Sequence, residues 1–186
     1  KKSAQALSKR VTDSMQTLSM QGGVFVVDVA KGEPSAKGSD MIEFRVAGHP
    51  GVTPQAIQKV ASGGELARIS LAITVNTVES TPVPTLIFDE VDSGIGGAVA
   101  ETVGRYLRLL AKNKQVLCVT HLPQVAAQGH NHFQVSKDIS AQTTRSKIVQ
   151  LEAKARVEEI ARMLGGQVIT EATRTAAHEM IASANG

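Results

Sequence analysis

Two adjacent carboxylates at the end of an apolar strand are the strongest chemical signal in the sequence. Asp89 and Glu90 directly follow the apolar residues Leu86-Ile87-Phe88. Successive side chains of a strand point to opposite faces, so the two carboxylates are expected to do different work. One would hold a hydrated Mg²⁺ while the other polarises a water molecule, as phosphoryl transfer from ATP requires. The alternative is a strand that ends in a solvated acidic turn.

A second signal lies upstream, where Ser62-Gly63-Gly64-Glu65 opens a helical pattern. Ser62 and Glu65 fit a capping box, which is a purely structural explanation for these two residues. It does not explain Gly63 and Gly64, because glycine in a helix costs about 0.5 to 1 kcal/mol relative to alanine. We therefore expect something to approach the backbone there. The free N–H groups and the positive end of the helix dipole suit a phosphate.

A third signal is His121, which follows the next predicted strand. In open parallel sheets, ligands bind outside the carboxyl ends of the strands, so His121 is expected at the same edge as Asp89 and Glu90. It is a candidate contact for a γ-phosphate, with an ordinary loop histidine as the alternative. The turn Asp92-Ser93-Gly94 adds polar groups that could reach a neighbouring subunit.

Strands and helices alternate in the pattern that would position these residues. The sequence predicts an α/β fold with a mostly parallel sheet flanked by helices, whose central apolar strands are covered on both faces. Helices are predicted at 4–18, 62–79, 96–112, 154–164 and 170–182, and strands at 24–29, 41–47, 84–89, 115–120, 132–137 and 145–151. The first two strands are expected to form a hairpin with a mobile tip at 31–40.

Composition limits the class of protein. The 186 residues are 42% hydrophobic, which is enough for one domain with its own core. The net charge of +3 is a small excess, much less than the clustered Lys and Arg residues of a typical nucleic-acid-binding protein would give. No apolar run is long enough to cross a bilayer and the first 20 residues lack a signal sequence, so we expect a soluble, cytoplasmic protein without a membrane partner. Because Cys118 is the single cysteine, an internal disulfide is excluded. Its apolar neighbours predict a small core residue rather than a nucleophile.

Three weaker patterns are also possible sites. The glycines of 94–99 begin five residues after a strand, too late for a dinucleotide-binding turn. His130 and His132 lack acidic or cysteine neighbours and fit a surface turn better than a metal pair. Arg105, Arg108 and Lys112 share one helix face, which is typical of a solvated face and only secondarily of a DNA-phosphate contact.

Taken together, the signals resemble one family. The segments 61–68, 87–95 and 119–126 are similar to the signature, the Walker B strand with its D-loop, and the switch-histidine segment of an ABC-type ATPase head, in the RecN branch of the SMC-like proteins. Leu164-Gly165-Gly166 adds to the resemblance, which covers about residues 40–182. It implies that residues 1–19 are the end of a coiled-coil helix and that residues 20–186 are the C-terminal half of such a head.

The resemblance also implies a function, namely an ATPase for bacterial DNA double-strand-break repair and recombination, with ATP and Mg²⁺ between two closed heads. It makes Asp89 the metal ligand, Glu90 the general base and His121 the γ-phosphate sensor, and it places Asp92 in the D-loop, which would face the opposite head. Ser62, Gly63, Gly64 and Glu65 would contact the nucleotide of that opposite head, and would therefore lie far from Asp89 within one chain. The implied partners are a second head, the Walker A half of the protein and DNA, in the nucleoid.

Two departures refine this interpretation. Ala61 and Glu65 stand where transporter ATPases have Leu and Gln, which favours the SMC-like branch. No Gly-x-x-x-x-Gly-Lys-[Ser/Thr] loop occurs in the chain, so we expect the chain alone to be inactive. Two alternatives stay open: an ATPase subunit of another ABC system, and a non-catalytic dimerisation or DNA-docking module.

Overall fold

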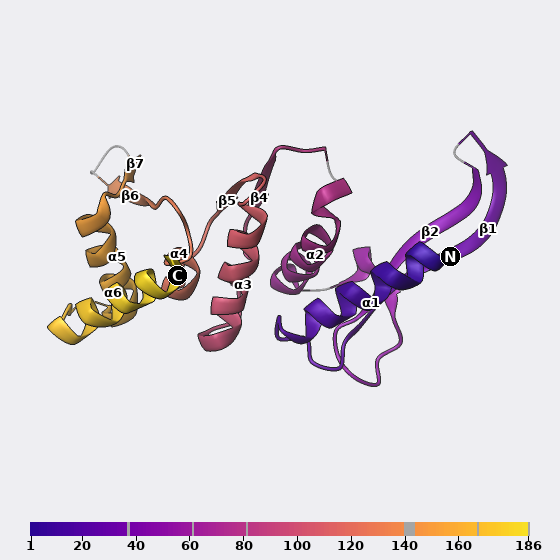
Figure 1. Cartoon of the computed structure of the whole chain (residues 1–186), viewed down its shortest axis with the longest axis horizontal. Coiled ribbons are helices and arrows are strands. Elements are labelled where there is room, and N and C mark those ends of the chain that lie inside the picture. The colour runs from indigo at the N-terminus through magenta and orange to yellow at the C-terminus, as the bar shows by residue number, and fades with distance from the viewer. Residues whose placement is uncertain (37, 61, 81, 140–143, 167, 186) are drawn as a thin grey trace. The chain divides into compact units, whose positions relative to one another are not determined.

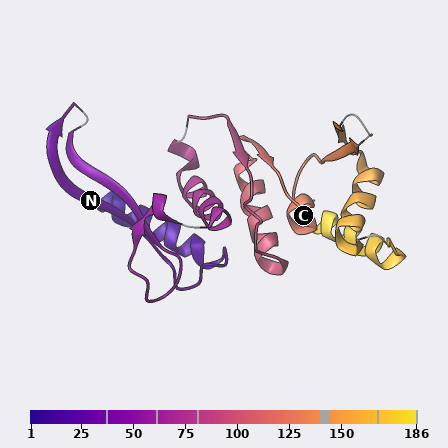
Figure 2. The same cartoon turned by 180° about the vertical axis from the view of Figure 1, so that it is seen from behind.

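The computed structural model describes residues 1–36, 38–60, 62–80, 82–139, 144–166 and 168–185. The chain divides into two compact units, Lys1–Thr120 and His121–Gly186. Both units combine helices with short sheets, as expected for an α/β protein (Figures 1 and 2).

The first unit begins with a helix packed on a long hairpin. Strands β1 (Val24–Ser35) and β2 (Gly38–Ala47) pair antiparallel, and the short β3 (Gln55–Ala56) pairs with the other edge of β2. The predicted hairpin is present, but its expected tip at 31–40 is largely strand, with an irregular register between Lys31 and Ser35. Backbone pairing thus continues through a segment whose composition is typical of turns, because cross-strand hydrogen bonds do not depend on side-chain type.

Helix α1 (Lys2–Gln16) confirms the predicted amphipathic helix. Val11, Met15 and Leu18 are fully buried, and Figure 1 shows α1 running along the hairpin. The Thr12 hydroxyl also bonds the backbone of Phe25, donating to its carbonyl oxygen at 3.2 Å and accepting from its N–H at 2.9 Å. The second half of α1 is therefore part of the core of this unit, and its continuation into a coiled coil stays a prediction.

The predicted alternation of helices and strands follows. Helices α2 (Gly63–Thr77) and α3 (Gly97–Leu110) and strands β4 (Thr85–Phe88) and β5 (Gln115–Cys118) lie close to their predicted ranges. Short 3₁₀ turns, η1 (Ile57–Lys59) and η2 (Val78–Ser80), flank α2. In Figure 1 α1, α2 and α3 follow one another, and α3 packs against β5.

The expectation of a mostly parallel sheet is wrong for the described strands. They form three separate sheets, of which only β4 with β5 is parallel. The reason lies in the lengths of the connections. Strands β4 and β5 are joined through a helix, as parallel neighbours require, whereas in each other pair the second strand begins within eight residues of the end of the first, which is too close for the crossover that parallel pairing needs.

One face of the parallel pair is open. Ile87 and Leu117 are register partners and keep 71% and 47% of their surface exposed, and Val119, two residues further along, keeps 64%. Phe88, which points to the opposite face, is buried. The prediction that both faces are covered is therefore wrong for this chain by itself.

The second unit is a hairpin with a small helical core. It contains the short helix α4 (Pro123–Ala126), which the sequence pattern did not predict, then β6 (Phe133–Ile139), β7 (Thr144–Gln150), α5 (Ala153–Gly165) and α6 (Glu171–Asn185). Its core gathers Ala126, Ala127, Val157, Ile160, Ala161 and Ala177. The Arg156 guanidinium donates to the carbonyl oxygens of Ala127 at 2.9 Å and Gly129 at 2.6 Å, and so caps the end of α4. None of the helices in the described ranges has the length and apolarity to cross a membrane.

Candidate functional site

The two carboxylates lie on a tight turn directly after β4. The strand ends at Phe88, so strand alternation does not reach Asp89 and Glu90, and the expectation that it separates them is wrong. Asp89 instead accepts a hydrogen bond on Oδ1 from the Glu90 backbone N–H at 2.9 Å. The N–H of Ser93 donates to the Glu90 carbonyl oxygen at 3.0 Å and closes the turn. Both carboxylates are exposed.

The Glu90 backbone is strained. Its φ is 56°, in the left-handed region, which costs an L-residue without special turn chemistry about 1 to 2 kcal/mol. Such residues persist where the surrounding structure holds them, and they cluster at functional sites. The turn therefore holds the second carboxylate in a conformation that a free chain would rarely adopt.

Ser62 caps α2 as predicted. Its Oγ accepts a hydrogen bond from the Glu65 N–H at 3.3 Å. The Glu65 carboxylate lies 4.0 Å from Nε2 of His49, at the end of the hairpin. The capping-box explanation therefore holds for Ser62, while Glu65 faces a cation when His49 is protonated.

The two glycines admit a close neighbour, as expected, but that neighbour belongs to the same chain. A Cβ atom on Gly63 would lie 2.7 Å from Oε2 of Glu90. A Cβ atom on Gly64 would lie 2.9 Å from the carbonyl oxygen of Ser93. The turn formed by residues 89–93, which we call the carboxylate turn, thus occupies the space in which we expect a phosphate.

This contact corrects a second expectation. Ser62, Gly63, Gly64 and Glu65 were expected far from Asp89 within one chain. Instead, a groove between α2 and β4 is lined by both Gly63 and Asp89, together with the half-exposed Leu66. The glycine turn and the carboxylate turn therefore form one surface of a single chain.

Asp92 does not reach outward. Its side chain is only 2% exposed, and its Oδ2 accepts a hydrogen bond from the Thr120 hydroxyl at 2.5 Å. The Asp92 side chain is therefore used within its own chain, and contact of the 92–94 turn with a neighbouring subunit stays a prediction. Asp92 ties the loop after β4 to the chain leaving β5, while the exposed Ser93 and Gly94 form the outer part of the loop.

Sequence reasoning missed Arg68 as well as Thr120. Arg68 is 6% exposed, and its Nη1 donates to the Ser93 carbonyl oxygen at 2.7 Å. The signal was present in the spacing, because Arg68 lies four residues after the buried Gly64 and four before the buried Ala72. A charged residue on the apolar face of a helix indicates a buried polar partner.

The two strand ends are adjacent, as predicted. Beyond the last paired residues, the N–H of Val119 donates to the Phe88 carbonyl oxygen at 3.0 Å. Thr120, the next residue, holds Asp92. His121 opens the second unit and is exposed, and its approach to the carboxylates stays a prediction.

Cys118 is not a nucleophile in this environment. Burial, together with the negative charges of Asp92 and Asp89, raises the pKa of its thiol to about 12. Because the thiolate is the reactive form, the thiol stays protonated and inert at neutral pH. Cys118 is only half-buried and does not belong to the buried core, so the predicted core position is not fully confirmed.

The donor set at the carboxylate turn fits a Mg²⁺ ion held jointly with a nucleotide. Within the described ranges, no group of three or more His, Cys, Asp or Glu could hold a metal by itself. Mg²⁺ bound to nucleotides is held by one or two protein carboxylates, by phosphate oxygens and by water. Asp89, exposed at the strand end, can provide such a carboxylate.

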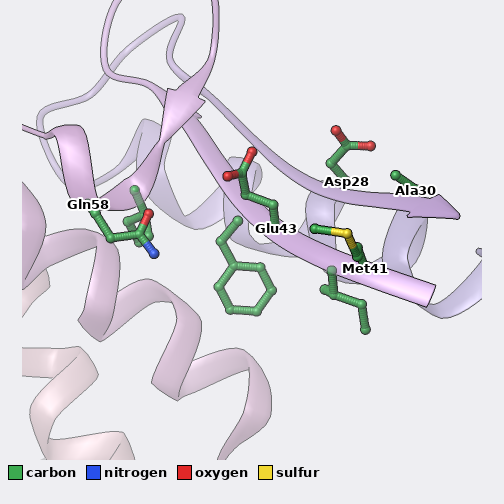
Figure 3. A pocket seen from close by; sticks show the side chains of 8 residues that line it. Asp28, Ala30, Met41, Glu43 and Gln58 are labelled. Atoms are coloured by element: carbon green, nitrogen blue, oxygen red, sulfur yellow. The ribbon is translucent and has the colours of Figure 1, made fainter. Parts of the chain in front are cut away.

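A second groove lies on the hairpin, away from these residues in the sequence (Figure 3). Asp28 and Glu43 are cross-strand partners there, with Met41 and Gln58 also in its lining. The Arg45 guanidinium lies 3.7 Å from the Asp28 carboxylate and 3.6 Å from that of Glu43. The two acidic groups therefore belong to a surface ion-pair cluster that offsets their mutual repulsion.

Curated proteins of similar sequence include several DNA repair proteins. The chain is 48% identical over 183 residues to the DNA repair protein RecN of Xylella fastidiosa, covering 97% of this chain and 33% of that protein. It is 46% identical over 183 residues to the DNA repair protein RecN of Vibrio cholerae, with the same coverage. The chain thus spans about a third of the length of these relatives. No protein-family model matches it.

Solved structures agree on the fold. The Smc head domain of Pyrococcus yayanosii matches with a TM-score of 0.61 at 21% identity, covering 86% of this chain and 29% of that one. A chain solved in a study of the ATP-driven dimerization and DNA-stimulated activation of SMC ATPases matches with a TM-score of 0.54 at 22% identity, covering 90% of this chain and 96% of that one. The predicted fold, a lobe of an SMC-type head, is confirmed by these matches.

Proposed function

The chain belongs to the RecN family of SMC-like proteins, and we propose that it is the C-terminal half of an ATP-hydrolysing head that acts in DNA double-strand-break repair. In this proposal ATP and Mg²⁺ lie between two such heads. The proposal includes DNA as a partner and a location in the nucleoid, and the name of the relatives, DNA repair protein, supports both. The observation that supports the proposal best is the placement of two exposed carboxylates, on a strained turn, against the glycine-opened start of α2.

The residues present can divide the work of hydrolysis. Asp89 would hold Mg²⁺, which when bound polarises the phosphate oxygens and neutralises developing charge. Glu90 would accept a proton from the attacking water. His121 would contact the γ-phosphate, and the Ser62–Glu65 turn would contact the nucleotide of a second head through its N–H groups.

A further polypeptide segment is part of the proposal. The chain has no phosphate-binding loop of the Walker A type. The exposed Ile87, Leu117 and Val119 form an apolar face on the only parallel strand pair of the described residues. Parallel strands are normally covered on both faces, so we propose that the segment carrying the Walker A loop packs there. We call the chain together with that segment the assembled head.

Reconstitution tests the proposal. The chain is mixed with a separately produced Walker A segment of the same protein, and phosphate release from Mg·ATP is measured. We expect turnover by the mixture and none by the chain alone, with loss of at least about 100-fold for Glu90→Gln. Arg105→Met, on the exposed face of α3, is the matched control and should keep wild-type turnover.

Three outcomes would contradict the proposal. Turnover by the chain alone would show that no further segment is needed. Wild-type turnover by the Glu90→Gln mixture would remove the general base. Retention of DNA by the mixture with no response to nucleotide would favour a non-catalytic docking module instead.

A further inference from the structure

Arg68 is a charged residue in an apolar setting. It lies on the buried face of α2 beside Ile69, Leu71 and Ala72, with 6% of its surface exposed. Burial lowers the pKa of its guanidinium, although the charge of Glu65 opposes this effect. Keeping a cation in such a place costs free energy unless it is hydrogen-bonded to a specific partner.

The partner of Arg68 is a backbone atom of the carboxylate turn. Its Nη1 donates to the Ser93 carbonyl oxygen at 2.7 Å, a short, charge-assisted bond. Its Nε is buried and finds no acceptor among the described residues. Since a carbonyl oxygen brings no charge to neutralise, the bond serves to fix the position of the loop.

Ser93 links Arg68 to Glu90 through two hydrogen bonds of its backbone. The Ser93 N–H closes the turn on the Glu90 carbonyl oxygen at 3.0 Å, so both peptide groups of Ser93 are held, one by Arg68 and one by Glu90. The same turn contains the left-handed backbone of Glu90. A strained residue keeps its conformation only when its neighbours hold it there, and the bond from Arg68 fixes the same loop three residues further along the chain.

We propose that Arg68 is a positioning residue for the reaction, which holds the Glu90–Ser93 turn against the first turn of α2 and so sets the place of the Glu90 carboxylate. This inference rests on the proposed function, because it assigns a role toward Glu90 as general base. Arg68 itself touches neither nucleotide nor water in this role. Its effect is on the orientation of the base, and therefore on the chemical step.

The test uses the assembled head with Arg68→Met, Arg68→Lys and the control Arg105→Met. Methionine keeps most of the apolar stem but cannot donate, so kcat for ATP should fall about 10- to 100-fold while KM stays within about twofold. Lysine keeps the charge but lacks the planar fork, so its kcat should lie between those of the Met variant and the wild type. Arg105→Met should leave kcat unchanged.

A double-mutant cycle separates positioning from general loss of structure. In the Glu90→Gln background, Arg68→Met should lower the residual turnover no further, because the group that Arg68 orients is already gone. Denaturant unfolding of each chain variant shows whether it folds. If the Met variant does not fold, the same cycle is run with Arg68→Lys.

The following results would contradict the inference. Wild-type kcat in both Arg68 variants would overturn it, as would a rise in KM without a change in kcat. An equal loss in the wild-type and Glu90→Gln backgrounds would show a structural role only. If Glu90→Gln itself keeps full turnover, the proposed function fails, and this result is distinct from a failure of the Arg68 assignment.

Discussion

Oxygen Oε2 of Glu90 lies 2.7 Å from the point where a Cβ atom at position 63 would be. The nearest approach to the neighbouring Gly64 comes instead from a backbone atom, the carbonyl oxygen of Ser93, at 2.9 Å. A side-chain end can rotate away, whereas a carbonyl moves only with its loop. The two glycines therefore tolerate a methyl group very differently.

We expect Gly63→Ala to keep or slightly raise stability, by up to about 1 kcal/mol, because alanine is the better helix former. Gly64→Ala should instead destabilise the chain by about 1 to 3 kcal/mol through overpacking. Denaturant unfolding of the two variants measures both effects. In the assembled head, Gly63→Ala should still lower kcat, since the Glu90 carboxylate must move. Equal stability of the two variants would contradict the assigned contacts.

The Thr120 hydroxyl stabilises the buried Asp92 carboxylate through a bond of 2.5 Å. Thr120→Val removes the donor without changing the shape of the side chain, and should cost about 1 to 3 kcal/mol of unfolding free energy. The matched control is Thr85→Val, which removes a bond of 3.0 Å to Gln115 at the surface of the same unit and should cost less than about 0.5 kcal/mol. The prediction fails if the two variants are equally stable.

A substitution on the open face of β4 and β5 should weaken binding of the Walker A segment without changing the stability of the chain. Ile87 is 71% exposed, so Ile87→Ser should change the stability of the chain alone by no more than about 0.5 kcal/mol. The same variant should bind the Walker A segment at least about 10-fold more weakly, measured by titration calorimetry, because an apolar contact is lost from the interface. Val168→Ser, equally exposed at 70%, is the control and should leave binding unchanged. Unaltered binding by Ile87→Ser would place the segment on another surface.

The second unit should lose stability in acid through Glu159. This residue is 8% exposed, and it accepts hydrogen bonds from Arg162 at 2.7 and 2.8 Å and from Gln134 at 2.6 Å. These bonds, chiefly the one to Arg162, hold the pKa of the Glu159 carboxyl below its ordinary value of 4.5. The unfolded chain therefore takes up the proton first, so this stabilisation is complete above pH 4.5 and is lost as the pH falls below it.

Urea unfolding at several pH values between about 7 and 3 measures this effect, with m-values compared to confirm the same transition. Glu159→Gln should be less stable near neutral pH, and its stability should change less between about pH 5 and 3 than that of the wild type. The control is Glu171→Gln, which removes an exposed carboxylate and should keep the wild-type pH profile. Parallel profiles for all three chains would contradict the prediction.

The order of the elements was predictable because it depends on local pattern. The amphipathic spacing of α1 and the apolar runs of β4 and β5 are confirmed close to their predicted ranges. The division of the described strands into three separate sheets was less predictable, since which strands share a sheet depends on how the whole chain packs. The open face at Ile87 could not be foreseen either, because an apolar run has the same sequence whether its second face is covered by this chain or by another segment.

The chemistry of the site was predictable as residue types, but its geometry was not. Adjacent carboxylates after an apolar strand and paired glycines at a helix start were sufficient to select Asp89, Glu90 and the 62–65 turn. Their contact in one chain depends on long-range packing of α2 against the loop after β4, which no local pattern contains. Arg68 was detectable in principle, by asking why a charge falls on the apolar side of a helix.

The left-handed backbone at position 90 implies a trade-off between robustness and activity. Glycine or asparagine would adopt that left-handed conformation at a lower cost in free energy, so a chain selected only for stability would carry one of them there. Each would also remove the acid. Residue 90 is therefore a position where selection for thermostability alone should accumulate substitutions, at the expense of turnover.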